Sequence, residues 1–300
     1  MHRNSDSLPA VTALSPLFKK GLFLFVLGLA AGLALAETGT EGGSNGAGGV
    51  PLWEAGAFAG GLSAPAYPAS EDRSRNALVL PFFIYRGEIL HADQSGVGAH
   101  LVEQEKFALE MDFSGSPPVG SDSIPLRQGM PDLAPLLEVG PRVKLQIARP
   151  APGHSVYAEF PLRYVIEVRS GLQTQGFTMA PKIHYEYRPS AEWNLRGGAG
   201  FYYGDQKLNQ YFFGVPAEFA TATRPEFLAR GGLISTRLSL DLSFSASRDV
   251  RIYAYVRHEN YMVSANRDSP LFAQSSANTL GVAMTWTLGR SDTLVRRSSN

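Results

Sequence analysis

The sequence predicts an all-β protein, a transmembrane antiparallel β-barrel of about 12 strands, within a range of 10 to 14. Apolar and polar residues alternate over segments of roughly ten to thirteen residues, which indicates strands with one apolar and one polar face. Such strands exceed the usual length in soluble sheets and match tilted membrane-spanning strands. Short connections also alternate with long ones, as they do in outer-membrane barrels.

The N-terminal segment 1–36 is expected to be a cleaved secretory signal peptide. Lys19 and Lys20 precede an apolar run, and Ala34-Leu35-Ala36 supplies the small-x-small pattern of a cleavage site. A transmembrane anchor is the alternative, but the run covers about 16 residues and a span needs about 20. Segment 37–51 follows as a Gly-rich flexible leader.

The barrel itself is expected over residues 52–288. Its first strands are predicted at 52–63, 76–86, 88–95, 97–103 and 105–113. The third and fourth of these are short and separated only by "SGV". Merging them, or splitting 205–232, would give ten or fourteen strands.

The middle strands are predicted from the clearest alternation in the chain. Every even position from Val156 to Val168 is apolar, while Glu159 and Arg163 stand among the odd positions. These four strands are placed at 136–148, 154–169, 173–188 and 191–204.

The last strands are predicted at 233–246, 248–261 and 276–288. In the first of them, Leu240 is one of the apolar alternate positions, which would face lipid. Asp241 is one of the polar alternate positions, which would face the lumen. The final strand resembles the signal that barrel assembly machinery reads, but residues 289–300 continue beyond it as a polar C-terminal tail.

The long connections are predicted at 64–75, 114–134, 205–232 and 262–275, with short turns between them. If the short turns are periplasmic, both ends of the barrel chain lie in the periplasm and the long loops face outward. A soluble secreted β-sandwich is the alternative fold.

Polar positions of the strands mix both charge signs, which is typical of a network that fills a narrow barrel; a selective pore is the alternative. The predicted lumen-lining residues are Arg142, Lys144, Glu159, Arg163, Glu167, Lys182, Glu186, Arg237, Asp241, Arg251 and Arg257.

Enzyme chemistry is not expected, and neither is a cofactor or a metal. The chain has no cysteine, and its barrel segment 52–288 has no G-x-S-x-G and no H-E-x-x-H motif. His184 and Glu186 share a face, while His258 and Glu259 do not, so these pairs are expected to belong to polar networks. Without residues 1–36, 24 basic and 26 acidic residues remain (27 − 3 and 27 − 1), which gives no sign of nucleic-acid binding.

Six segments together resemble a known family. They are "WEAGAFAGGLSAPAYPASE", "PFFIYRGE", "RQGMPDLAPLLEVGP", "YFFGVP", "RPEFLARGG" and "DSPL". In this order and spacing the chain resembles the MipA/OmpV family over roughly residues 53–288. This family comprises outer-membrane proteins named for an MltA-interacting scaffolding protein. The chain departs from it at Tyr67-Pro68-Ala69-Ser70, where the family often has Tyr-x-Gly-Ser.

The resemblance implies a cell-envelope protein of the Gram-negative outer membrane, held in outer-membrane lipid. It further implies a scaffold that brings a lytic transglycosylase and a bifunctional murein synthase together for peptidoglycan remodelling. A small-solute channel or a surface-exposed adhesin is the alternative function.

The candidate interaction residues lie in two of the long loops. They are Met130, Pro131, Asp132, Leu133, Tyr211, Phe212 and Phe213. The predicted topology places both loops outside the cell, whereas murein enzymes are periplasmic. Scaffolding would therefore need inward-folded loops, or would use the periplasmic turns and the leader.

Overall fold

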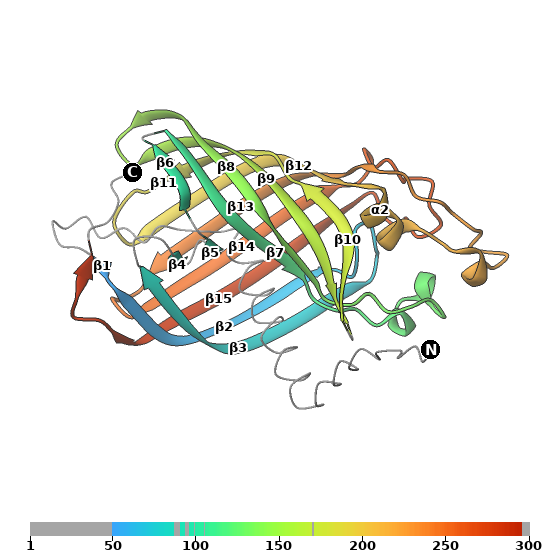
Figure 1. Ribbon diagram of the computed structural model, residues 1–300, viewed down its shortest axis with the longest axis horizontal. Coiled ribbons are helices and arrows are strands. Elements are labelled where there is room, and N and C mark those ends of the chain that lie inside the picture. The colour runs from blue at the N-terminus through green and yellow to red at the C-terminus, as the bar shows by residue number, and fades with distance from the viewer. Residues whose placement is uncertain are drawn as a thin grey trace, which may run out of the picture.

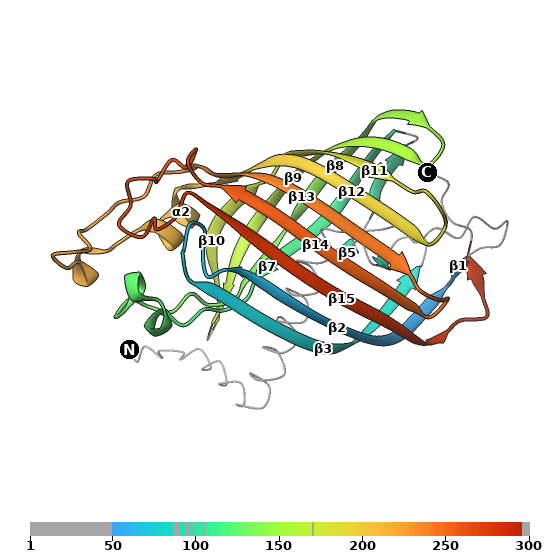
Figure 2. The ribbon, with the colours of Figure 1, turned by 180° about the vertical axis from the view of Figure 1, so that it is seen from behind.

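The computed structural model describes residues 50–86, 91–93, 96–98, 100–104, 106–169 and 171–295. Within these ranges one antiparallel sheet of fourteen strands curls into a barrel, as Figures 1 and 2 show from opposite sides. The predicted fold class is thus confirmed. The signal peptide expected over 1–36 and nearly all of the leader expected over 37–51 lie outside the described residues.

Consecutive strands of the barrel pair with each other, except for β5 with β6 and β10 with β11, and the last long strand pairs with the first. In chain order the strands are β2 (Trp53–Pro65), β3 (Arg73–Arg86), β4 (His91–Asp93), β5 (Gly96–Gly98), β6 (His100–Gln104), β7 (Phe107–Ser116), β8 (Leu136–Ala151), β9 (His154–Val168), β10 (Leu172–Met179), β11 (Lys182–Tyr187), β12 (Trp193–Gly204), β13 (Gly232–Ser245), β14 (Val250–Asn260) and β15 (Ser276–Arg290).

The circuit of the sheet begins at β5 and ends at β6, which are neighbours in the sequence. β5 pairs with β4, and β6 pairs with β7. The two strands at the ends of the sheet order therefore follow each other directly in the sequence. Counting β5 with β6 and β10 with β11 as single interrupted strands gives 14 − 2 = 12, the number expected.

The strand predicted at 173–188 is wrong in one respect, because it is interrupted at Ala180 and Pro181. Proline has no amide hydrogen to donate to a ladder. The Ala180 amide still donates to the Pro161 carbonyl (3.3 Å), and the Pro181 carbonyl accepts from the Phe201 amide (3.0 Å). The wall therefore stays hydrogen-bonded across the interruption.

Beyond the barrel sheet, β1 (Val50–Pro51) pairs with β16 (Leu294–Val295). The Leu52 amide donates to the Thr293 carbonyl (2.8 Å) and continues this pairing. The last two residues of the expected flexible leader and residues 294–295 of the expected polar tail thus lie side by side, at the end of the barrel that carries the short turns (Figure 1).

The polarity of the barrel wall is the reverse of that of a soluble protein. Large apolar side chains of the outer face are exposed, among them Leu240 (56 %) and Val282 (62 %), while Arg163 (2 %) and Glu159 (3 %) are buried inside. A soluble sheet would bury its apolar face. Among the described residues, no helix has the length and hydropathy needed to cross a membrane.

Aromatic residues border the apolar outer band at both ends. Trp193 packs against Phe244 (ring centroids 4.4 Å apart) near the short turns, and Phe201 lies exposed near the long loops. Trp193 and Phe201 lie on one strand, eight residues apart, which is about 26 Å along the strand and about 20 Å along the normal at the usual tilt. Aromatic girdles at this separation are typical of a membrane-spanning band.

The four long connections fold together into a cap over one end of the barrel. They contain α2 (Gln206–Phe213) and the 3-10 turns η1 (Ser121–Ser123), η2 (Pro125–Arg127) and η3 (Ala217–Phe219). The apolar residues buried in the cap and the adjoining barrel mouth are Tyr67, Ala69, Ile124, Met130, Leu133, Leu136, Val165, Ala180, Tyr202, Leu208, Phe212, Phe213, Val215, Ala229, Ile234, Tyr261, Leu271 and Ala277.

Several hydrogen bonds join the first long connection to the last one. The Tyr67 hydroxyl donates to the Leu271 carbonyl (2.8 Å), and the Ala69 carbonyl accepts from the Ala273 amide (3.0 Å). Burial raises the pKa of Tyr67 to about 12, so this donor stays protonated at neutral pH. The cap thus has a core of its own that no single loop supplies.

The orientation of the barrel can be tested with protease. We expect proteinase K added to intact cells to cut within 114–134 or 205–232, where Thr223 and Leu228 are exposed, and to spare the short turn at 149–153. Permeabilised cells serve as the control, since they should expose 149–153 as well. Cleavage at 149–153 in intact cells with an untouched cap would reverse the orientation.

Candidate functional site

The lumen carries a row of charged residues that runs across neighbouring strands, from the short-turn half of β8 to the cap end of β14. Strand register aligns Lys144 (β8), Glu159 (β9), Lys182 (β11), Gly200 (β12), Arg237 (β13) and Glu259 (β14), each the partner of the next. Opposite charges directly across a strand pair stabilise a sheet. The row alternates in sign except at Gly200, which stands between Lys182 and Arg237.

Glu159 is the centre of the first ion-pair cluster. Its carboxylate lies 3.2 Å from Lys182 Nζ, 3.6 Å from His184 Nδ1 and 3.9 Å from Arg142 Nη1. It is almost fully buried, and a buried carboxylate is tolerated only where cations of this kind surround it. His184 also stacks on the Tyr157 ring (centroids 5.2 Å apart).

Arg163 organises the second cluster, toward the barrel mouth. Its Nε donates to Asp112 Oδ2 at 2.6 Å, and its Nη1 lies 3.4 Å from Glu138 Oε2. Glu138 also accepts hydrogen bonds from the Thr178 hydroxyl (3.1 Å) and the Tyr202 hydroxyl (3.3 Å). Several neighbouring strands are thereby joined through one guanidinium and its acids.

The third cluster surrounds Glu259 on the opposite wall. Its carboxylate accepts from Arg237 Nε (2.8 Å) and the Ser235 hydroxyl (3.0 Å), and Arg257 Nε lies 3.4 Å away. The Arg237 guanidinium also lies 3.6 Å from the centroid of the Tyr202 ring, a cation–π contact. Arg237 is thus fixed from two sides.

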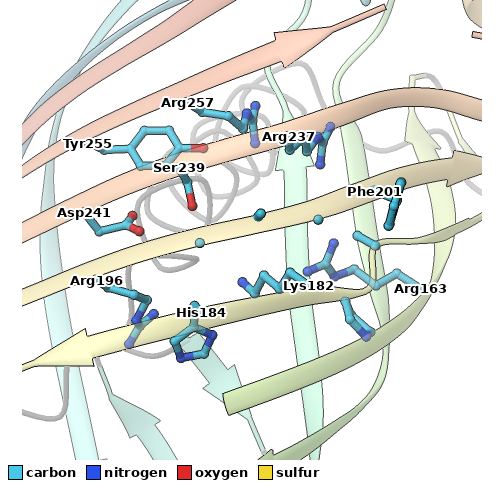
Figure 3. Close-up of a pocket in the computed structure, with 15 residues that line it drawn as sticks. Arg163, Lys182, His184, Arg196, Phe201, Arg237, Ser239, Asp241, Tyr255 and Arg257 are labelled. Carbon is cyan, nitrogen blue, oxygen red and sulfur yellow. The ribbon is translucent and has the colours of Figure 1, made fainter. Parts of the chain in front are cut away.

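Two of the cavities among the described residues lie between these clusters. The inner one, of about 40 Å³, lies at the level of Gly198 and Gly200, and Figure 3 shows the side chains around it. The outer one, of about 140 Å³, extends from the lumen to the underside of the cap. Four residues line both cavities: Arg163, Arg237, Tyr255 and Arg257.

The structure places all eleven residues predicted to line the lumen at buried or half-buried positions of the barrel strands, among them four charged residues of the aligned row. At the short-turn end, Glu186 accepts hydrogen bonds from Arg188 Nε (2.8 Å) and from Asn194 (2.9 Å). At the other end, Arg169 Nε donates to Glu167 Oε1 (2.6 Å).

Sequence reasoning missed two inward residues that matter, Glu138 and Arg196, and it expected Glu259 in a polar network without counting it among the lumen-lining residues. Glu138 lies on the same face of β8 as Arg142, and Glu259 lies on the same face of β14 as Arg257. Extending the alternation of polar and apolar residues to the strand ends would therefore have identified both acids. Arg196 is followed on β12 by glycine and alanine residues, which do not show the alternation of polar and apolar side chains.

The candidate interaction residues of the cap are divided between its core and its surface. Met130, Leu133, Phe212 and Phe213 are buried, whereas Pro131 and Asp132 are exposed. Tyr211 is half-buried, and its hydroxyl donates to the Ala134 carbonyl (3.3 Å). In this conformation the four buried side chains support the cap, and only the exposed ones are open to a partner.

No catalytic constellation is seen in the described part of the chain. His184 and Glu186 are both buried on the inner face, but the His184 ring faces Glu159. His258 is exposed on the outer face, where its Nδ1 lies 2.8 Å from Asn278 Oδ1, whereas Glu259 is buried inside. The described ranges contain no group of three or more His, Asp or Glu that could hold a metal ion.

The inverted wall, the aromatic girdles and the ionic lumen define an integral β-barrel protein of the outer membrane. The model of the family described as "MltA-interacting protein MipA" matches residues 57–288. This match covers most of the chain, and the chain belongs to that family.

Among solved structures, the chain is similar to a NanC porin (8 % identity, TM-score 0.35, 77 % of this chain and 100 % of that one). It is also similar to outer membrane phospholipase A from Escherichia coli (11 %, 0.33, 85 % and 98 %). A third is the CymD monoaromatic hydrocarbon channel (9 %, 0.33, 79 % and 89 %). No curated protein matches the chain.

Proposed function

We propose that this protein is an outer-membrane scaffold for peptidoglycan-remodelling enzymes. The family description, an MltA-interacting protein, supports a lytic transglycosylase as one partner. A bifunctional murein synthase is the second partner of the proposal. The N-terminal signal peptide expected over 1–36 would bring the chain to the envelope.

The observation that carries this proposal is the occupied lumen. The two cavities, about 40 and 140 Å³, are small beside the 300–1,000 Å³ that is usual for a pocket binding a drug-sized molecule. Ion pairs fill the space between them, and the cap covers one end. Such a barrel is better suited to binding a protein partner at its surface than to conducting solutes through a wide pore.

The short-turn end is the surface that we assign to the partner. It presents a mixed-charge rim with Glu192, Arg248 and Asp249 exposed, and the Arg290 guanidinium bonds to Asp249 and to the Arg248 carbonyl. The β1–β16 pair projects from the same end. In the predicted orientation this end is periplasmic, where murein enzymes are found.

Site-specific photocrosslinking in envelopes tests the proposal. A photoreactive amino acid at Ser190 or Asp249 should capture a lytic transglycosylase or a murein synthase, while the same amino acid at Thr223 or Val263 of the cap serves as the matched control. Capture from the cap alone would move the partner outside and oppose this role. If no position captures a murein enzyme and the purified protein conducts ions in planar bilayers, the channel function is supported instead.

A further inference from the structure

The inner cavity is lined by an excess of positive charge. Five cations and one acid contribute to its wall: Arg163, Lys182, Arg196, Arg237 and Arg257 against Asp241. Ser239 and Tyr255 add hydroxyl groups, and His184 completes the polar lining. Hydrogen-bond donors therefore predominate around this space.

The carboxylates that fix these cations lie outside the inner cavity. Asp112 holds Arg163 (2.6 Å), Glu159 holds Lys182 (3.2 Å) and Glu259 holds Arg237 (2.8 Å), and none of these three acids lines the inner cavity. The cations are thus positioned by ion pairs before any ligand enters, which lowers the cost of binding.

The aligned row of charges explains where the excess arises. Going around the wall, Glu159 separates Lys144 from Lys182, and Glu259 follows Arg237. Between Lys182 and Arg237 stands Gly200, the direct partner of both. Gly200 adds no acid between these two cations, and it lines the inner cavity together with them.

We propose that the inner cavity binds a small anionic group, a carboxylate or a phosphate, between Lys182, Arg237 and Arg257. A volume of about 40 Å³ holds about three water molecules at 10–15 Å³ each, which is close to the bulk of such a group. Guanidinium groups suit both anions, because their N–H donors form charge-assisted pairs with carboxylate and phosphate oxygens.

The outer cavity provides the approach to this site. It shares Arg163, Arg237, Tyr255 and Arg257 with the inner cavity, so the two cavities adjoin at these residues. A bound solute would hold its anionic group in the inner cavity and its remaining atoms toward the cap. This site goes beyond the scaffold function and does not depend on it.

Titration calorimetry of the purified full-length protein in detergent, with inorganic phosphate and with acetate, tests the site. The Arg237→Gln and Arg257→Gln variants should each bind at least about tenfold more weakly, because each loses a charge-assisted hydrogen bond. Asp241→Asn should bind several-fold more tightly, because it removes the one acid of the wall. Arg230→Gln, at an exposed position of the cap that lines neither cavity, is the matched control and should bind as the unchanged protein does.

Opposite effects of the Arg237 and Asp241 variants are the decisive result, since a merely structural role would shift both in the same direction. If an arginine variant fails to fold, Ser239→Ala removes only a hydroxyl from the lining and should still weaken binding. Absence of binding heat with both probes overturns the site, as does an equal loss in Arg230→Gln. Preference for phosphate over acetate assigns the ligand group to the phosphate class, and the reverse preference assigns it to the carboxylates.

Discussion

Replacing Arg163 with methionine should lower the free energy of unfolding by about 3–5 kcal/mol. The Arg163 side chain is only 2 % exposed, and it holds both Asp112 and Glu138 inside the barrel. Methionine keeps much of the bulk but leaves two buried carboxylates without this cation, which is the costly way to break a buried ion pair. Urea unfolding of the protein in lipid vesicles measures the loss.

Arg290→Met is the matched control for this substitution. Arg290 also pairs with an acid, Asp249, but both side chains are substantially exposed (35 % and 54 %), and such pairs contribute about 0–1 kcal/mol. Adding Asp112→Asn to Arg163→Met should recover part of the stability, because the two residues share one network. Equal losses for Arg163→Met and Arg290→Met would contradict the buried network.

Replacing Leu240 with arginine should cost about 2–4 kcal/mol, the usual penalty for a cation on the lipid face near the middle of a barrel strand. Leu240 lies on β13 with 56 % of its surface exposed, between its partners Gly197 and Val256. In water an exposed leucine tolerates such a change within about 0.5 kcal/mol. The same urea titration therefore separates lipid from water at this position.

Leu228→Arg is the control for the lipid-facing substitution. Leu228 is 72 % exposed as well, but it belongs to the cap, outside the membrane band. We expect a change within about 0.5 kcal/mol there. A small effect at Leu240 as well would place the outer face of β13 in water and oppose the membrane-spanning barrel.

The barrel was predictable because strand alternation is a local property. Position 240 and position 241 face opposite sides of any strand, so the sequence alone separates Leu240 from Asp241. The structure agrees, with Leu240 exposed and Asp241 buried. The row of charges that runs through Gly200 was not predictable in this way, because it depends on the register between six strands, which the alternation within one strand does not determine.

The cap was predicted only as loops, although it contains an eight-residue helix. Asp205 begins α2 as its N-cap and accepts from the Leu208 amide (3.0 Å), and Leu208 and Phe212 are spaced for one buried helix face. These are recognisable helix signals. The core of the cap could not be predicted from the sequence, because residues far apart in the chain, such as Tyr67 and Leu271, are in contact there.

The hydrogen bond between Tyr67 and Leu271 also has a consequence for the assembly of the barrel. Tyr67 precedes β3 and Leu271 precedes β15, a separation of 204 residues, so their hydrogen bond forms only after the last strand has reached the first. Contacts between residues so far apart in sequence are slow to form. We therefore expect the cap to be completed late, and a chain in which β15 has not paired with β2 would lack the contact that covers Tyr67.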